Sequence, residues 1–226
     1  MKKKLRSRAK RIQQQHPSAA VEVWAMDEHH LGLKPIIRRV WVGYGEQPIA
    51  NVNWRYQWLW LYGFVHPSTG ETYFWILPKV NIELFNKVLV DFAREFGVGK
   101  DKHILLAIDQ AGWHTSTQVR LPEGLHLEFM PSHSPELQPA ERLWPLINEP
   151  IANRSFKNLD ELEEVLFQRC QVLLKQPSLI KGISCFYWWP KPKLYHSGAT
   201  EIDISPRANF LGAAWQSSQV WKKYRV

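Results

Sequence analysis

Apolar residues gather in short runs rich in β-branched and aromatic side chains, and polar turn-forming segments separate them. This alternation predicts a sheet. The runs are Val21–Met26, Trp54–Val65, Thr72–Leu77, His103–Ile108 and Leu125–Met130. The second and third flank the turn sequence HPSTGE, in which Pro67 and Gly70 supply turn dihedrals, so we expect them to form a hairpin. A further short strand is expected at Arg38–Trp41, before a Gly-rich turn.

Helical periodicity appears between the strand-like runs. From Asn81 to Phe96 apolar residues recur at intervals of three and four, and Gly97 is placed to end the helix. Pro139 can occupy the first turn of a helix that carries Glu141, although Pro145 should shorten or kink that helix. Asn158 begins a last clear helix, with Glu161 three residues further on. Three antiparallel strands followed by parallel ones, with helices on both faces, make an α/β mixed sheet.

Charge divides the chain into three parts. Met1–Arg11 holds seven basic residues and no acid, residues 12–190 hold 16 basic and 19 acidic residues, and residues 191–226 hold six basic and two acidic. We expect a basic arm or linker at 1–20, one domain at 21–190 and an irregular basic tail at 191–226. Basic ends suit a polyanionic partner, although a basic run is often only a solvated tail.

Composition limits the cellular setting. Cys170 and Cys185 fit neither a disulfide framework nor a metal-finger spacing, and residues 12–20 are too polar for a secretory signal. No stretch approaches the roughly 20 apolar residues that span a bilayer. A soluble, cytoplasmic protein with no membrane partner is therefore expected.

Three acids are candidates for chemistry. Asp27 and Asp109 each follow a predicted buried strand, where an open α/β sheet presents its site, and Glu141 lies on the helix after the next strand. Carboxylates without nearby cysteine suit Mg²⁺ or Mn²⁺, and three of them could hold two ions for phosphoryl displacement. Acids at strand ends are also often only solvated. Zinc at His29, His30 and His133 is a weaker alternative, because no cysteine lies nearby.

Three segments resemble the signatures of bacterial insertion-sequence transposases of the mariner superfamily. They are MDEHHLGL from Met26, AIDQAGWH from Ala107 and MPSHSPELQPAERLW from Met130, and the third is too long and particular to arise by chance. Gln110 and Gln138 stand where the family usually has Asn, and Pro145 and Asn148 replace residues that favour the helix after Trp144.

The resemblance implies a ribonuclease H-like fold and Asp27, Asp109 and Glu141 as the catalytic, metal-binding acids, with two Mg²⁺ or Mn²⁺ ions. It further implies DNA cleavage at transposon ends and strand transfer into a TA target, by a homodimer bound to DNA. Candidate DNA contacts are Lys34, Arg38, Arg39, His114 and Arg142, and Trp113 and Trp144 could stack on bases.

Family members usually begin with a helix-turn-helix region, and from this comparison we expect the chain to lack it. The alternative is therefore a non-enzymatic, DNA-binding or oligomerising remnant of a truncated transposase. A stand-alone nuclease of the same fold is disfavoured, because the third motif is transposase-like.

Overall fold

The computed structural model describes residues 1–47, 49, 53–132 and 134–190. Its helices and strands are, in chain order, α1 (Lys2–Gln15), β1 (Ala20–Gly32), β2 (Trp58–His66), β3 (Glu71–Leu77), α2 (Ile82–Glu95), β4 (Lys102–Ile108), β5 (Leu125–Phe129), the 3₁₀ helices η1 (Pro135–Leu137) and η2 (Pro139–Leu143), α3 (Trp144–Asn148), α4 (Leu159–Leu174) and α5 (Pro177–Ser184).

The five strands form one mixed sheet in the order β3-β2-β1-β4-β5. The strands β1, β2 and β3 pair antiparallel, and β4 and β5 extend the sheet in parallel to β1. The turn between β2 and β3 uses Gly70 at φ 86°, a conformation that favours glycine. The predicted hairpin and the mixed α/β sheet are therefore confirmed.

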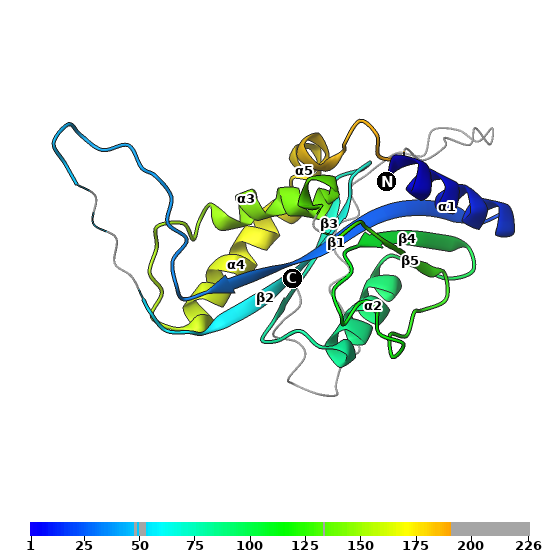
Figure 1. The fold of residues 1–226 in the computed structure, drawn as a ribbon, viewed down its shortest axis with the longest axis horizontal. Coiled ribbons are helices and arrows are strands. Elements are labelled where there is room, and N and C mark those ends of the chain that lie inside the picture. The colour runs from blue at the N-terminus through cyan, green and yellow to red at the C-terminus, as the bar shows by residue number, and fades with distance from the viewer. Residues whose placement is uncertain (48, 50–52, 133, 191–226) are drawn as a thin grey trace.

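Helices cover both faces of this sheet, as predicted (Figure 1). On one face α2 packs Phe85, Leu89 and Phe92 against alternate residues of the central strands. On the other face α1, α4 and α5 pack against the intervening residues, which include Val23 and Leu105. Because strand side chains alternate between faces, each residue at a strand end is assigned to one of these two layers.

The helix α1 was not predicted. Its residues Leu5 and Ile12 are buried in the core on the side of α4 and α5, one helical heptad apart. Lys4 fixes the helix to the end of β5, because its ammonium pairs with Glu128 and donates to the carbonyl of Phe129 at 2.9 Å. The basic segment thus packs on the sheet, and the boundaries 1–20, 21–190 and 191–226 stay predictions.

Two predicted helix starts are confirmed. The side chain of Asn81 accepts from the backbone N–H of Leu84, and that of Asn158 accepts from the backbone N–H of Glu161. The first of these helices ends before Gly97, whose φ of 62° lies in the left-handed region.

The predicted strand at Arg38–Trp41 is wrong, because this segment is neither strand nor helix. Its backbone is instead bound by Asn153, whose side chain bonds both the N–H and the carbonyl of Arg38. Trp41 is fully exposed, so the segment lacks the packed face on which a strand depends.

The predicted tail at 191–226 lies outside the described residues. Within the part that the structure describes, no helix combines the length and the apolar character needed to cross a membrane.

Candidate active site

Asp27 lies within β1, and Asp109 directly follows the neighbouring strand β4. Ala25 in β1 pairs with Ala107 in β4, and each acid follows its alanine by two residues. Both alanines are buried in the same core cluster, so the two acids continue the face that α4 and α5 cover. The structure therefore brings together the two acids that the sequence pattern singled out. The predicted end of the first strand before Asp27 is wrong, because β1 continues to Gly32 by pairing with β2, and Asp27 lies inside the strand.

Glu141 comes to this face from a 3₁₀ helix. Pro139 is the first residue of η2, while Ala140 and Leu143 are buried and fix the helix against the sheet. The 3₁₀ helix ends at Leu143, and Trp144 is the first residue of α3. Pro145 lies in the first turn of the following helix α3, where proline is tolerated, so its predicted effect on the helix that carries Glu141 stays a prediction.

Asp27 and Glu141 influence each other electrostatically. Burial raises the pKa of Asp27 to about 7, and the nearby carboxylates of Glu141 and Glu28 add to this rise against the hydrogen bond from Trp144. Burial also raises the pKa of Glu141. Two partly buried carboxylates that lie close together repel each other. A bound cation would relieve this repulsion, so the site favours cation binding.

His114 connects Asp109 to Glu28, which lies on the opposite face of β1. Its Nδ1 lies 2.7 Å from Oδ1 of Asp109, and its Nε2 lies 2.7 Å from Oε1 of Glu28. A turn makes this possible: Asp109 accepts from the N–H of Ala111, and the N–H of His114 donates to the carbonyl of Ala111. His114 thus holds the chain after β4 against the end of the sheet.

This geometry requires the imidazolium form of His114. Both ring nitrogens face carboxylate oxygens, which only accept hydrogen bonds when ionised. Burial lowers the pKa of His114, but the hydrogen bonds to Asp109 and Glu28 outweigh it and raise the pKa to about 9. In turn, the hydrogen bond from His114 lowers the pKa of Asp109, which keeps that carboxylate ionised.

Gln110 and Gln138, which stand where the resembled signatures usually have Asn, both donate hydrogen bonds to backbone carbonyls near the three acids. Gln110 donates to the carbonyl of Met130 at the end of β5, and Gln138 donates to the carbonyl of Met26, beside Asp27. Each amide therefore links a segment that carries a candidate acid to a neighbouring strand.

Sequence reasoning missed the structural roles of Glu28, His29 and Trp144. Trp144 had been considered for base stacking, but it is buried and donates its indole N–H to Oδ2 of Asp27 at 2.9 Å. His29 stacks on Trp144 and bonds the side chain of Asn148 in α3. The spacing of Asp27 and His29, two residues apart on one strand, was the available signal that they share a face.

The other candidate DNA contacts occupy different surroundings. Lys34 lies over the ring of Trp54, Arg142 lies over the ring of Phe186, and Arg39 is exposed. Arg38 donates to the carbonyl of Pro145. Their roles in DNA binding stay predictions, and so does that of His114, which is buried between two carboxylates.

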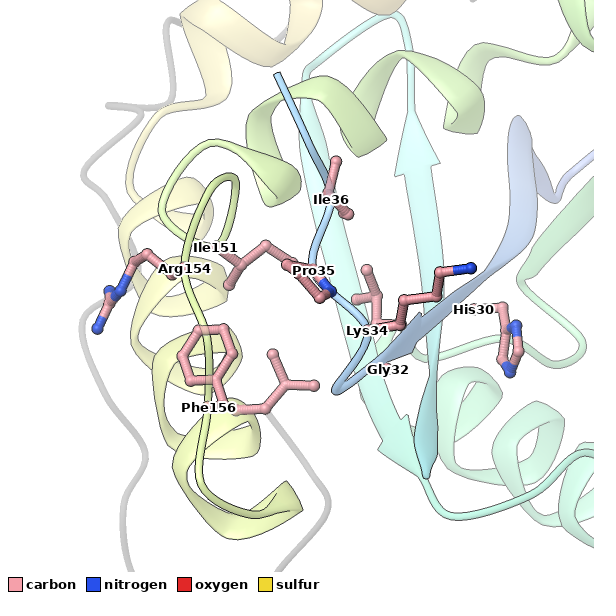
Figure 2. A pocket seen from close by; sticks show the side chains of 10 residues that line it. His30, Gly32, Lys34, Pro35, Ile36, Ile151, Arg154 and Phe156 are labelled. Carbon is pink, nitrogen blue, oxygen red and sulfur yellow. The ribbon is translucent and has the colours of Figure 1, made fainter. Parts of the chain in front are cut away.

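A small cavity lies away from the three acids. It has a volume of about 80 Å³ and lies where the end of β1 meets the segment before α4 (Figure 2). Apolar side chains, among them Pro35, Ile151 and Phe156, line much of it, while the charged ends of Lys34 and Arg154 point away. We interpret this cavity as a packing gap and not as a substrate site.

The donors present fit divalent cations. Asp27, Asp109 and Glu141 offer hard carboxylate oxygens, and burial together with the nearby carboxylates of Glu141 and Glu28 raises the pKa of Asp27. A second group, formed by Glu28, Asp109 and His114, has ligand atoms within 4.8 Å of one another. In that group His114 already bonds both acids, so we interpret it as the support of Asp109. Of the zinc candidates, His29 bonds Asn148, His30 packs on Trp58 and Trp60, and His133 lies outside the described residues.

Comparison with known proteins agrees with this geometry. The family model of the DDE superfamily endonucleases matches residues 22–163. An uncharacterised protein of Sinorhizobium fredii, y4pE/y4sA, is 31% identical over 132 residues, which are 58% of this chain and 96% of that relative.

Solved structures of the Mos1 transposase share the fold. Its paired-end complex with the left transposon end matches at a TM-score of 0.50 and 16% identity, over 83% of this chain and 61% of that chain. A pre-cleavage Mos1 transpososome (16% identity, 82% and 61%) and the Mos1 mariner paired-end complex with Mn (15% identity, 82% and 62%) both match at 0.51. The chain thus spans about three fifths of the Mos1 chains it matches.

The ribonuclease H-like arrangement predicted from the sequence is therefore confirmed as the fold. The matched residues include all three acids and more than half of the chain, and on this basis the protein belongs to the DDE superfamily endonucleases.

Proposed function

We propose that this chain cleaves DNA phosphodiester bonds with divalent metal ions held by Asp27, Asp109 and Glu141. The observation that carries the proposal is that Asp27 and Asp109 each lie two residues beyond Ala25 and Ala107, the last residues that pair β1 with β4. Glu141 is near enough to raise the pKa of Asp27. Family membership supports the same chemistry. Two Mg²⁺ or Mn²⁺ ions would activate the attacking water or 3′-hydroxyl and stabilise the leaving oxygen.

The chain's own residues hold these acids in place. His114 fixes Asp109 as a carboxylate, and Gln138 ties the segment before Glu141 to β1. Asp27 must lose its proton before it can act as a ligand. Because its pKa is about 7 in the metal-free protein, metal binding should weaken as the pH falls below 7.

The exposed face of α1 offers a path for DNA. Lys3, Arg6 and Lys10 lie on the face opposite the buried Leu5 and Ile12, and all three are exposed. The contact of Lys4 with the carboxyl end of β5 brings this helix next to the sheet edge that carries Asp109. A fixed row of cations attracts phosphates and releases their counterions, which suits a duplex that must reach the acids.

Changing Lys3, Arg6 and Lys10 to Ala together should therefore weaken binding to any DNA sequence. Each lost phosphate contact removes about 0.9 from the slope of log affinity against log salt, so the triple variant should lose up to roughly 2.7. Fluorescence anisotropy with a labelled duplex across a salt series measures this slope. A variant with Ala at the exposed Lys79, Lys100 and Lys175 is the control, and an equal loss in both variants would contradict a role for α1.

The finer assignment rests on the resemblance of the three motifs to mariner-superfamily transposases. We infer cleavage at transposon ends and strand transfer into a TA dinucleotide, with a homodimer assembled on DNA. The Mos1 complexes with transposon ends support this assignment by their shared fold. Lys34, Arg38, Arg39 and Arg142 are the proposed DNA contacts outside α1.

Nicking of supercoiled plasmid tests the proposal. The purified chain should convert supercoiled plasmid to open circles in Mn²⁺ and not in EDTA. Salt-dependent DNA binding by a folded chain, without nicking in either Mg²⁺ or Mn²⁺, would instead favour a non-enzymatic DNA-binding or oligomerising protein.

A further inference from the structure

Trp144 is held from several directions against the acid that it contacts. Its ring lies on Gly63 of β2, the residue that pairs across the strands with Asp27. His29 stacks on the indole with ring centroids 4.9 Å apart and planes 14° from parallel, and bonds Asn148 at the end of α3. The indole therefore has little freedom to turn.

Gly63 provides the space for this ring. A methyl group added there would lie 2.6 Å from Cη2 and 3.0 Å from Cζ3 of Trp144, and the first of these distances is too short for a real contact. The neighbouring positions in β2, Tyr62 and Phe64, carry large buried side chains. A glycine between two bulky residues of a strand is unfavourable unless another group needs the space.

The only polar atom of this confined ring points at a proposed metal ligand. The indole Nε1–H donates to Oδ2 of Asp27 at 2.9 Å. A carboxylate group can rotate about its side-chain bond. A fixed hydrogen-bond donor to one of its two oxygens therefore selects one orientation of the carboxylate. Groups that orient metal ligands in this way affect affinity although they never touch the ion.

We propose that Trp144 is a positioning residue for the carboxylate of Asp27, and that Gly63 is needed opposite Asp27 to admit its indole. This inference rests on the proposed function, because it takes Asp27 to be a metal ligand. According to this inference, Trp144 and Gly63 act together, because the indole at the start of α3 contacts both Asp27 in β1 and Gly63 in β2.

The Trp144→Phe variant tests the positioning role directly, since it keeps an aromatic ring and removes the N–H that donates to Asp27. We expect its affinity for Mn²⁺, measured by isothermal titration calorimetry without DNA, to fall about 10- to 100-fold. Gly63→Ala should lower the affinity in the same direction by displacing the ring. Two matched controls should stay within about twofold of wild type: Trp189→Phe, which removes a buried indole N–H bonded to Val23, and Gly99→Ala, where a methyl group meets nothing.

A second measurement uses the unaltered protein, so that it does not depend on the folding of any variant. In a ¹⁵N-labelled sample, titration with Mg²⁺ should shift the indole N–H resonance of Trp144 and leave that of Trp189 in place. Wild-type Mn²⁺ affinity in a folded Trp144→Phe variant, or an unmoved Trp144 resonance at saturating Mg²⁺, would overturn the inference alone. Absence of metal binding by the wild-type protein would instead overturn the proposed metal site, and this inference with it.

Discussion

The Asp109→Asn variant should nick supercoiled plasmid at least roughly 10³-fold more slowly than the wild-type chain in Mn²⁺. Asn keeps the size of the side chain and its hydrogen bond to Ala111, but it removes the negative charge that a divalent ion requires. Loss of one group that stabilises charge in a transition state typically costs about 10²- to 10³-fold, and loss of a metal ligand removes more than one such interaction. Asp27→Asn and Glu141→Gln should show losses of the same order.

The matched control is Glu136→Gln, which removes an exposed carboxylate five residues before Glu141 in the same segment. Its nicking rate should equal that of the wild type. Thermal unfolding of every variant separates a lost site from a lost fold. If Glu141→Gln nicks at the wild-type rate, Glu141 is not one of the essential acids.

A His114→Ala variant should lose about 3–5 kcal/mol of unfolding free energy. The side chain of His114 is 0% exposed and that of Glu28 only 5%, so the substitution leaves a buried carboxylate with its main partner removed. Breaking a buried ion pair from one side has this cost because the remaining charge stays desolvated. Urea unfolding of the metal-free protein at pH 7 measures the loss.

A double variant separates the ion pair from simple packing. Glu28→Met combined with His114→Leu removes both charges and keeps apolar volume, so it should recover much of the stability lost in His114→Ala. A double variant as unstable as His114→Ala would show that shape, and not charge, determines the role of His114.

The ion pair of His114 with Glu28 should make the unfolding free energy of the wild-type protein fall at alkaline pH. The folded pKa of His114, about 9, lies above its ordinary value of 6.5, so its contribution is complete below about pH 6.5 and disappears as the pH rises through about 9. Unfolding free energies from urea titrations in EDTA should decline over this interval in the wild type. In Glu28→Gln the decline should be smaller, because one of the two carboxylates that raise the pKa is gone.

Local patterns in the sequence were sufficient for most of the fold. Strand runs such as His103–Ile108 and the capped helix at Asn81 depend on residue spacing and on a side chain two or three positions away. The predicted strand at Arg38–Trp41 failed because Asn153, more than a hundred residues later, binds that backbone. The helix α1 was missed because only Leu5 and Ile12 mark its buried face amid many charges.

The sequence likewise predicted one part of the candidate site and missed another. The order of elements and motif resemblance singled out Asp27, Asp109 and Glu141, although β1 continues past Asp27 to Gly32 and only Asp109 directly follows a strand. The contacts of Trp144 with Asp27 and of His114 with Glu28 depend on which faces and loops meet in three dimensions. Sequence spacing carries no information on such meetings between residues that lie 117 or 86 positions apart.

The most direct test of the metal site is anomalous scattering from crystals of the protein grown with Mn²⁺. We expect manganese peaks bounded by the carboxylates of Asp27, Asp109 and Glu141, with His114 still bonded to Glu28. A peak coordinated by Glu28 and His114, with none beside Asp27 or Glu141, would contradict the account and assign the metal to the opposite face of β1.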